Sequence, residues 1–150
     1  MLNSLFERLP GVSPEQRHSA ALTWLECSAG VAEPGTRDEI ASAACAIIAD
    51  PRFADLFGAD SLAEAPIAAT LADGRVVAGT VDRLLVTDEL VRVIDFKTGR
   101  LVPDDARSIP PSHRAQMLAY SEALAIIFPG RRIEAALLYS AAPKLILVDG

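Results

Sequence analysis

The stretch GTVDRLLVTDELVRVIDFKTG, residues 79–99, decides the fold, because it places two apolar, β-branched runs on either side of the polar break Asp88-Glu89. This pattern predicts a β-hairpin. Counting outward from a two-residue turn at the break places Asp82 opposite Asp95. Directly opposed side chains on one face of a hairpin have Cβ atoms about 5 Å apart. The sequence therefore predicts two like-charged carboxylates at close range.

A lysine belongs to the same group. Lys97 follows Asp95 by two residues, so its side chain leaves the strand on the same face. Both faces of the predicted hairpin are otherwise mostly apolar, which indicates that both are covered. Carboxylates at the edge of a core need a cation as partner. A divalent metal site explains this group, and the alternative is a salt-bridge cluster of Lys97 with Asp95 or Asp82.

Two carboxylates and a lysine around an oxygen-loving ion suit the hydrolysis of a phosphodiester. The metal would polarise the phosphoryl oxygen and lower the pKa of a bound water. Lys97 would orient that water or stabilise the charge that develops on the phosphate. Mg²⁺ fits such a site because it needs only one or two protein carboxylates, and Mn²⁺ is the second choice.

The helices are predicted from apolar spacing and from breaker residues. Capping boxes are expected at Ser13 with Gln16 and at Thr36 with Glu39, and Ser112 is expected to cap the last helix. The predicted helices are a short one over residues 1–9, two over 13–30 and 36–50, a helical turn from Phe53 that closes at Gly58, and one over 112–128.

The strands are expected to begin near Leu62. Asp73-Gly74 predicts a two-residue hairpin turn, which pairs Ala72 with Arg75 and, by extension, Glu64 with Arg83. With the hairpin of residues 79–97, this gives a three-strand antiparallel meander, followed by strands over 132–139 and 144–148. We expect an α/β or α+β domain with a central mixed sheet flanked by helices.

Composition limits the class of protein. The chain has 150 residues, enough for one domain, and no apolar run reaches the length of a membrane span. Its net charge of −6 argues against a free-standing nucleic-acid binder, although arginines in the C-terminal half leave room for a local basic rim. Cys27 and Cys45 are expected to be apolar fillers, so a reducing cytoplasm is the default location.

The helix over 112–128 carries a second group of polar residues. Gln116 and Tyr120 are four residues apart and so lie on one helical face, where both can hydrogen-bond phosphate oxygens or water. The alternative is an ordinary amphipathic helix with a packing tyrosine. His113 is expected at the start of this helix, near the phosphate path.

Three motifs in order resemble those of the RecB-like PD-(D/E)XK nucleases: Gly79-x-x-Asp82-Arg83, then Ile94-Asp95-Phe96-Lys97-Thr98-Gly99, then Gln116-x-x-x-Tyr120. The chain is most similar to the nuclease domain that ends AddA-type helicase–nuclease subunits of bacterial double-strand break repair. The likeness covers most of the chain. It implies a restriction-endonuclease-like fold and a Mg²⁺-dependent, exonuclease-like deoxyribonuclease that acts in DNA repair and recombination.

The resemblance also implies partners and a larger protein. The partners would be DNA, a helicase motor and a second nuclease subunit. Residues 1–150 would form a single nuclease domain, as a fragment or a stand-alone copy of a longer helicase–nuclease chain. No P-loop signature occurs in the sequence, so any ATP-driven unwinding must come from elsewhere.

The resemblance assigns roles to individual residues. Asp82 and Asp95 would bind the metal together with the main-chain carbonyl of Phe96, and Lys97 would be the catalytic lysine. Gln116 and Tyr120 would contact DNA or support the site. Thr98 and Arg114 are further candidates for contacting DNA. Glu64 is a recurrent strand residue in such nucleases, and its alternative role is the cross-strand pair with Arg83.

One position departs from the family pattern. The family's first helix usually supplies a histidine to the metal, and the matching position here holds Asn3. An asparagine oxygen can coordinate Mg²⁺, but it suits Mn²⁺ or Zn²⁺ less well than imidazole does. A weakened nuclease fold that binds DNA or a helicase partner without cutting is therefore the main alternative. A phosphohydrolase acting on small nucleotides is the third.

Overall fold

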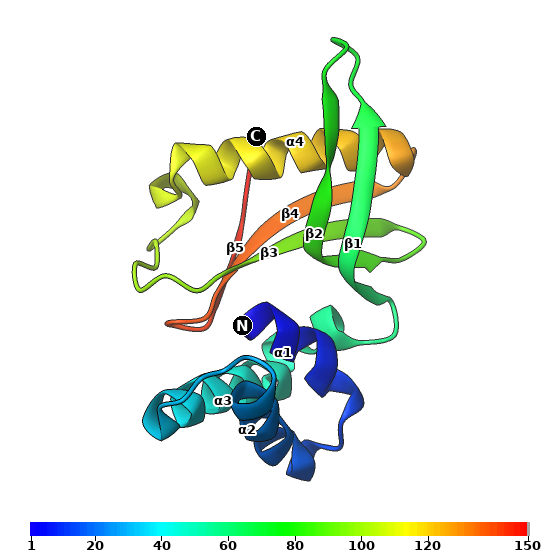
Figure 1. The fold of residues 1–150 in the computed structure, drawn as a ribbon. Coiled ribbons are helices and arrows are strands. Elements are labelled where there is room, and N and C mark those ends of the chain that lie inside the picture. Colours follow the sequence, from blue (N-terminus) through cyan, green and yellow to red (C-terminus); the bar gives the residue numbers. More distant parts are fainter. Residues whose placement is uncertain (150) are drawn as a thin grey trace. The chain divides into compact units, whose positions relative to one another are not determined.

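The computed structural model describes residues 1–149, which fall into two compact units (Figure 1). The N-terminal unit, Met1–Gly58, is helical. The C-terminal unit begins at Ala59 and contains the whole β-sheet. The prediction of a single domain over residues 1–150 stays a prediction.

The N-terminal unit is built from three α-helices joined by short 3₁₀ turns. Helix α3 contacts both α1 and α2. The elements are α1 (Leu2–Arg8), two 3₁₀ turns (Leu9–Gly11 and Pro14–Gln16), α2 (Arg17–Cys27), α3 (Pro34–Ala49) and a last 3₁₀ turn (Pro51–Phe57). The predicted helices are therefore present, although α2 begins later and ends earlier than expected.

The predicted helix caps are wrong. The Ser13 side chain makes no capping hydrogen bond, and the residues after it form a 3₁₀ turn before α2 begins. Helix α3 starts at Pro34, so its cap is Glu33, whose carboxylate accepts from the backbone N–H of Thr36 at 2.6 Å. The hydrogen bond from the Thr36 hydroxyl is the largest cause that lowers the pKa of Glu33, and the bonds from the backbone N–H groups of Thr36 and Gly35 lower it further. Ser112 lies inside the first turn of its helix, which begins at Pro111 and has no side-chain cap.

The C-terminal unit contains a mixed five-stranded sheet, as expected. Strand order follows the chain, β1-β2-β3-β4-β5. The three-strand meander is antiparallel, β4 runs parallel to β3, and β5 is antiparallel to β4. The strands are β1 (Ser61–Thr70), β2 (Val76–Val86), β3 (Leu90–Lys97), β4 (Arg132–Tyr139) and β5 (Lys144–Leu147).

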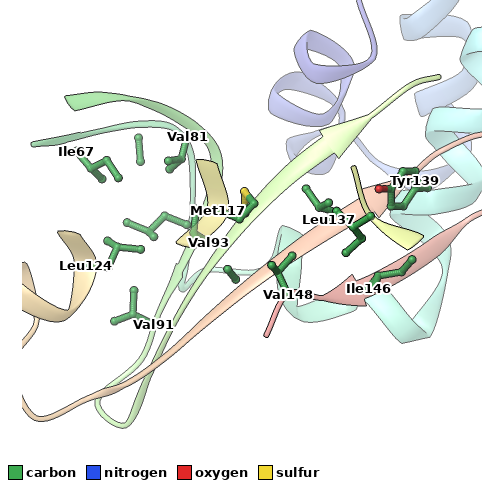
Figure 2. Close-up of a cluster of buried hydrophobic side chains, with 14 residues drawn as sticks. Ile67, Val81, Val91, Val93, Met117, Leu124, Leu137, Tyr139, Ile146 and Val148 are labelled. Carbon is green, nitrogen blue, oxygen red and sulfur yellow. The ribbon is translucent and has the colours of Figure 1, made fainter. Parts of the chain in front are cut away.

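Helix α4 (Pro111–Ile127) connects the two parallel strands and lies across one face of the sheet (Figure 1). It buries Met117 and Leu124 completely. Figure 2 shows these two side chains among apolar residues of the strands, including Val93 and Leu137. Each large apolar side chain buried in this way stabilises the fold by roughly 1.5–3 kcal/mol. The core of this unit therefore lies between α4 and the sheet.

The hairpin of β2 and β3 has the predicted register. Val86 pairs with Val91 and Arg83 pairs with Ile94. Thr87 closes the turn, because its N–H donates to the Leu90 carbonyl at 2.8 Å and its Oγ1 accepts from the Leu90 N–H at 3.0 Å. The next position along this register brings Asp82 level with Asp95.

The hairpin of β1 and β2 differs from the prediction by one residue. Its loop has three residues, 72–74, since the Leu71 N–H donates to the Arg75 carbonyl at 2.8 Å. Gly74 adopts φ +86°, the left-handed conformation that closes a three-residue hairpin loop. Arg83 therefore pairs with Ala63. The predicted pairing of Glu64 with Arg83 is wrong, and Glu64 is level with Asp82 instead.

Candidate active site

The two aspartates and the lysine meet on β2 and β3, as the hairpin arithmetic predicts. The Lys97 Nζ lies 2.7 Å from Asp95 Oδ2, and both side chains are about four-fifths buried. Asp82 Oδ2 accepts a hydrogen bond of 2.8 Å from the backbone N–H of Phe96. This bond fixes the Asp82 carboxylate against the neighbouring strand, one residue away from both Asp95 and Lys97.

The strands are irregular at this level of the sheet. Val81 and Leu84 belong to the same buried cluster, although residues three apart in a regular strand point to opposite faces. On β1, Glu64 has φ +48°, a left-handed conformation that costs a non-glycine residue about 1–3 kcal/mol. Backbone strain of this kind concentrates at functional sites. Here it lies directly beside Asp82.

Burial and like charge act together on Asp82. Burial is the largest cause that raises the pKa of Asp82, to about 6, and the negative charges of Asp95 and Glu64 raise it further. The hydrogen bond from Phe96 lowers this pKa only in part. The site therefore holds more negative charge than its surroundings stabilise, and a bound cation would relieve it.

The donor set fits a hard divalent ion. The side chains that could bind it are carboxylates, whose oxygens are the ligands that Mg²⁺ prefers. Within residues 1–149, no three His, Cys, Asp or Glu side chains come close enough together to hold a metal ion. Asp82 and Asp95 would thus supply two ligands and leave the other positions to main chain, water or substrate. Mg²⁺ is commonly bound in that way.

Gln116 and Tyr120 meet each other, and Tyr120 also meets β2. The Gln116 Nε2 donates to the Tyr120 hydroxyl at 3.4 Å. A Cβ atom built on Gly79 would lie 3.1 Å from that hydroxyl. The glycine of the first motif therefore makes room for the tyrosine of the third. A glycine inside a strand often marks such a close approach, which is the signal that the sequence offered.

The substitution Gly79→Ala tests this packing. The new methyl group is expected to displace the Tyr120 hydroxyl by a few tenths of an ångström and to break its hydrogen bond with Gln116. Stability should change by less than about 1 kcal/mol, because alanine favours the strand while the tyrosine tip yields. Denaturant unfolding and a crystal structure of the variant measure both effects. An unmoved Tyr120 hydroxyl contradicts the assignment.

The remaining residues predicted for the site are Arg114, Thr98, Asn3 and the main-chain carbonyl of Phe96. Arg114 donates through Nη1 to the Asp149 carbonyl at 2.8 Å and through Nη2 to the Ala106 carbonyl, so it anchors the chain around α4. Thr98 is exposed just after β3. Asn3 lies on α1 in the N-terminal unit. DNA contact by Arg114 and Thr98, and metal binding by Asn3 and the Phe96 carbonyl, stay predictions.

Tyr139 was missed by the sequence reasoning. It is the last residue of β4, and the parallel register pairs it with Lys97. Its side chain is 3% exposed, and its hydroxyl makes no hydrogen bond to any described residue. Burial raises the pKa of Tyr139, and the charge of Asp95 raises it further, so the hydroxyl keeps its proton. Parallel pairing across a helical connection leaves no register signal in the sequence, because no turn fixes it.

Comparison with known proteins points to a nuclease family. A family model described as PD-(D/E)XK nuclease superfamily matches residues 1–145. No curated protein matches the chain at a significant level. Across residues 1–149, the helices are all too short or too polar to cross a membrane.

Proposed function

The chain belongs to the PD-(D/E)XK nuclease superfamily, and from this premise we propose that Asp82, Asp95 and Lys97 hydrolyse phosphodiester bonds of DNA with a bound divalent cation. Nucleases of this superfamily generally use divalent metal ions. We further propose Mg²⁺ as that ion, with Mn²⁺ as a substitute, because the side chains offered are carboxylates.

The observation that carries the proposal is the opposition of two partly buried carboxylates beside a lysine. Asp82 is held with its pKa raised to about 6, which is unfavourable for a carboxylate that must be charged at neutral pH. A fold retains such a carboxylate where function requires it. The short contact between Lys97 and Asp95 places a positive charge at the same point.

Each residue of the site has its own role in the proposed hydrolysis. Asp82 and Asp95 would hold the cation, and the Phe96 N–H keeps the Asp82 carboxylate in one orientation. When bound, the cation would polarise the phosphoryl oxygen and lower the pKa of a coordinated water. Lys97 stabilises the negative charge that develops on the phosphate. Gln116 and Tyr120, joined by a hydrogen bond, contact phosphate oxygens of the strand from α4.

The finer role follows from the motif series rather than from the site. We propose that the chain degrades DNA from its ends during double-strand break repair, beside a helicase motor and a second nuclease subunit. The similarity of all three motifs to AddA-type nuclease domains supports this role. The family's first helix usually supplies a metal-binding histidine, and the matching position of this sequence holds Asn3.

A cleavage assay tests the proposed function. Linear duplex, linear single-stranded and closed circular DNA are incubated with the protein in Mg²⁺, Mn²⁺ or EDTA. We expect cleavage of linear DNA that requires the metal and is lost in Asp95→Asn. The control is Glu122→Gln, an exposed carboxylate on α4. Cleavage of closed circles would contradict the end-dependent mode.

Other outcomes would contradict the proposed metal-dependent site. Cleavage without metal, or full cleavage by Asp95→Asn, would show that the reaction does not use this site. Binding of DNA without any cleavage under all metal conditions would identify the chain as a module that binds and does not cut. Hydrolysis of mononucleotides without cleavage of DNA would instead select a small-molecule phosphohydrolase.

A further inference from the structure

A cavity beside the catalytic lysine is not used by the proposed chemistry. It measures about 470 Å³ and lies between the ends of β3 and β4 and the loop that connects β3 to α4. Its volume falls within the range of about 300–1,000 Å³ that small-molecule sites occupy. Lys97 lines it, so it opens next to the place where the scissile phosphate would bind.

The walls of this cavity are apolar, with a few polar atoms that have no partner. Leu101, Val102 and Pro103 from the loop supply much of the apolar lining. The Tyr139 hydroxyl and the His113 Nδ1 also belong to lining residues, and both atoms are buried without a hydrogen bond to any residue of the described chain. Buried polar atoms normally have partners, and leaving one unpaired costs stability. Because both residues line one cavity, a ligand bound in it could supply the missing partners.

The loop that closes the cavity is held in place by the rest of the unit. Lys144 of β5 donates to the Pro103 carbonyl at 3.2 Å and also to the Asp104 carbonyl. Asp105 accepts from the backbone N–H groups of Arg107 and Ser108 at 2.9 and 3.2 Å. Arg114 donates to the Ala106 carbonyl. The cavity is therefore formed before a ligand arrives, which lowers the entropic cost of binding.

The chemistry of the lining selects a flat ligand with polar edges. Apolar and aromatic walls accept the faces of a nucleobase, and a hydroxyl with an imidazole nitrogen can pair with its edge. Arg100 at the exposed part of the lining, together with Lys97, supplies positive charge for the attached phosphates. A base inside a Watson–Crick pair cannot enter such a cavity, whereas an unpaired base can.

We propose that this cavity binds an unpaired nucleobase of the DNA strand next to the scissile phosphate, so that the substrate is single-stranded or frayed DNA. This inference rests on the proposed nuclease function for its substrate, but base binding itself does not need cleavage. The binding residues are Tyr139 and His113 for the base edge, and Arg100 for the backbone.

Strand binding in EDTA tests the cavity separately from catalysis, because metal-dependent cleavage is then blocked. Fluorescence anisotropy compares labelled oligothymidylate with a strand of the same length in which abasic residues replace the thymidines. Wild-type protein is expected to bind oligothymidylate roughly tenfold more tightly than the abasic strand, as expected for one stacked and hydrogen-bonded base.

Variants test whether the preference for bases comes from the cavity. Ser108→Trp fills the cavity from its exposed rim and is expected to abolish the preference for bases. Tyr139→Phe removes the hydroxyl and His113→Leu removes the imidazole, and each change should reduce the preference for bases. Ala125→Trp, an exposed position near the other end of α4, is the control for an added indole and should leave it unchanged. Thermal melting verifies that each variant folds.

Several results would overturn the inference. They are equal binding of both strands by the wild type, no binding of either strand, or a base preference that survives both Ser108→Trp and Tyr139→Phe. A metal-dependent nuclease that cuts abasic and normal strands equally would leave the proposed function standing and remove the cavity's role. A base preference in a protein that cuts no DNA would support the role of the cavity and contradict the proposed function.

Discussion

Replacing Lys97 with methionine is expected to lower the rate of Mg²⁺-dependent DNA cleavage by about 10²–10³-fold, the loss typical of one group that stabilises developing charge. Methionine keeps the apolar stem of the partly buried side chain but removes the ammonium group that lies 2.7 Å from Asp95. The two aspartates remain, so Mg²⁺ is expected to bind the variant at least as tightly as it binds the wild type.

Lys97→Met should therefore separate the rate of cleavage from the affinity for Mg²⁺. Single-turnover cleavage measures the chemical step, and calorimetry measures the affinity for Mg²⁺. Arg132→Met is the matched control, because Arg132 is a largely exposed cation at the start of β4, away from the site residues along the strand. A Lys97→Met protein that cuts as fast as the wild type contradicts the catalytic role. If the variant loses both Mg²⁺ binding and cleavage, Lys97 is a structural residue.

Replacing Asp82 with asparagine is expected to stabilise the metal-free protein at pH 8 while abolishing cleavage. The folded-state pKa of Asp82 is raised to about 6 from 3.8, so the folded protein favours the protonated carboxyl. This group therefore contributes no penalty below about pH 4, and its penalty grows between pH 4 and pH 6 and stays constant above pH 6. Asparagine removes the charge, and its side-chain oxygen can still accept from the Phe96 N–H.

The gain should be on the order of 1 kcal/mol, after allowance for the partial exposure of the carboxylate. Thermal unfolding in EDTA at pH 5 and pH 8 measures it, and the gain should be larger at pH 8 than at pH 5. Adding Mg²⁺ should raise the melting temperature of the wild type and leave Asp82→Asn unchanged. Asp88→Asn, in the exposed turn between β2 and β3, is the control. A variant less stable than the wild type in EDTA at pH 8 contradicts the account.

Local signals in the sequence were enough to bring Asp82, Asp95 and Lys97 together. The turn at residues 88–89 fixes the register of β2 and β3, so the opposition of Asp82 and Asp95 follows by counting. The side-chain alternation of a strand then places Lys97 beside Asp95. These deductions held because the two-residue turn is followed by regular pairing from Val86 with Val91 to Arg83 with Ile94, which leaves one register only.

The errors in the fold came from single residues that shift a boundary. Gly74 adds a third residue to the first hairpin loop, and this moves Glu64 from Arg83 to the level of Asp82. Pro34 opens α3 early, so Glu33 caps it in place of Thr36.

The parts of the site that depend on contacts between residues far apart in the sequence could not be predicted from the sequence. Tyr139 reaches Lys97 because β4 is parallel to β3 after a long helical connection. The close approach of Tyr120 to Gly79 requires α4 to cross β2 at one point. The cavity beside Lys97 depends on Lys144 and Arg114 holding the loop before α4.

Anomalous diffraction from crystals soaked in Mn²⁺ tests the central claim most directly, because it locates the ion without requiring DNA or activity. The account predicts a Mn²⁺ peak bound by carboxylate oxygens of both Asp82 and Asp95, beside the Lys97 ammonium. It also predicts that the peak is absent from crystals of Asp82→Asn. Mn²⁺ bound elsewhere, with these two carboxylates free of metal, would contradict it.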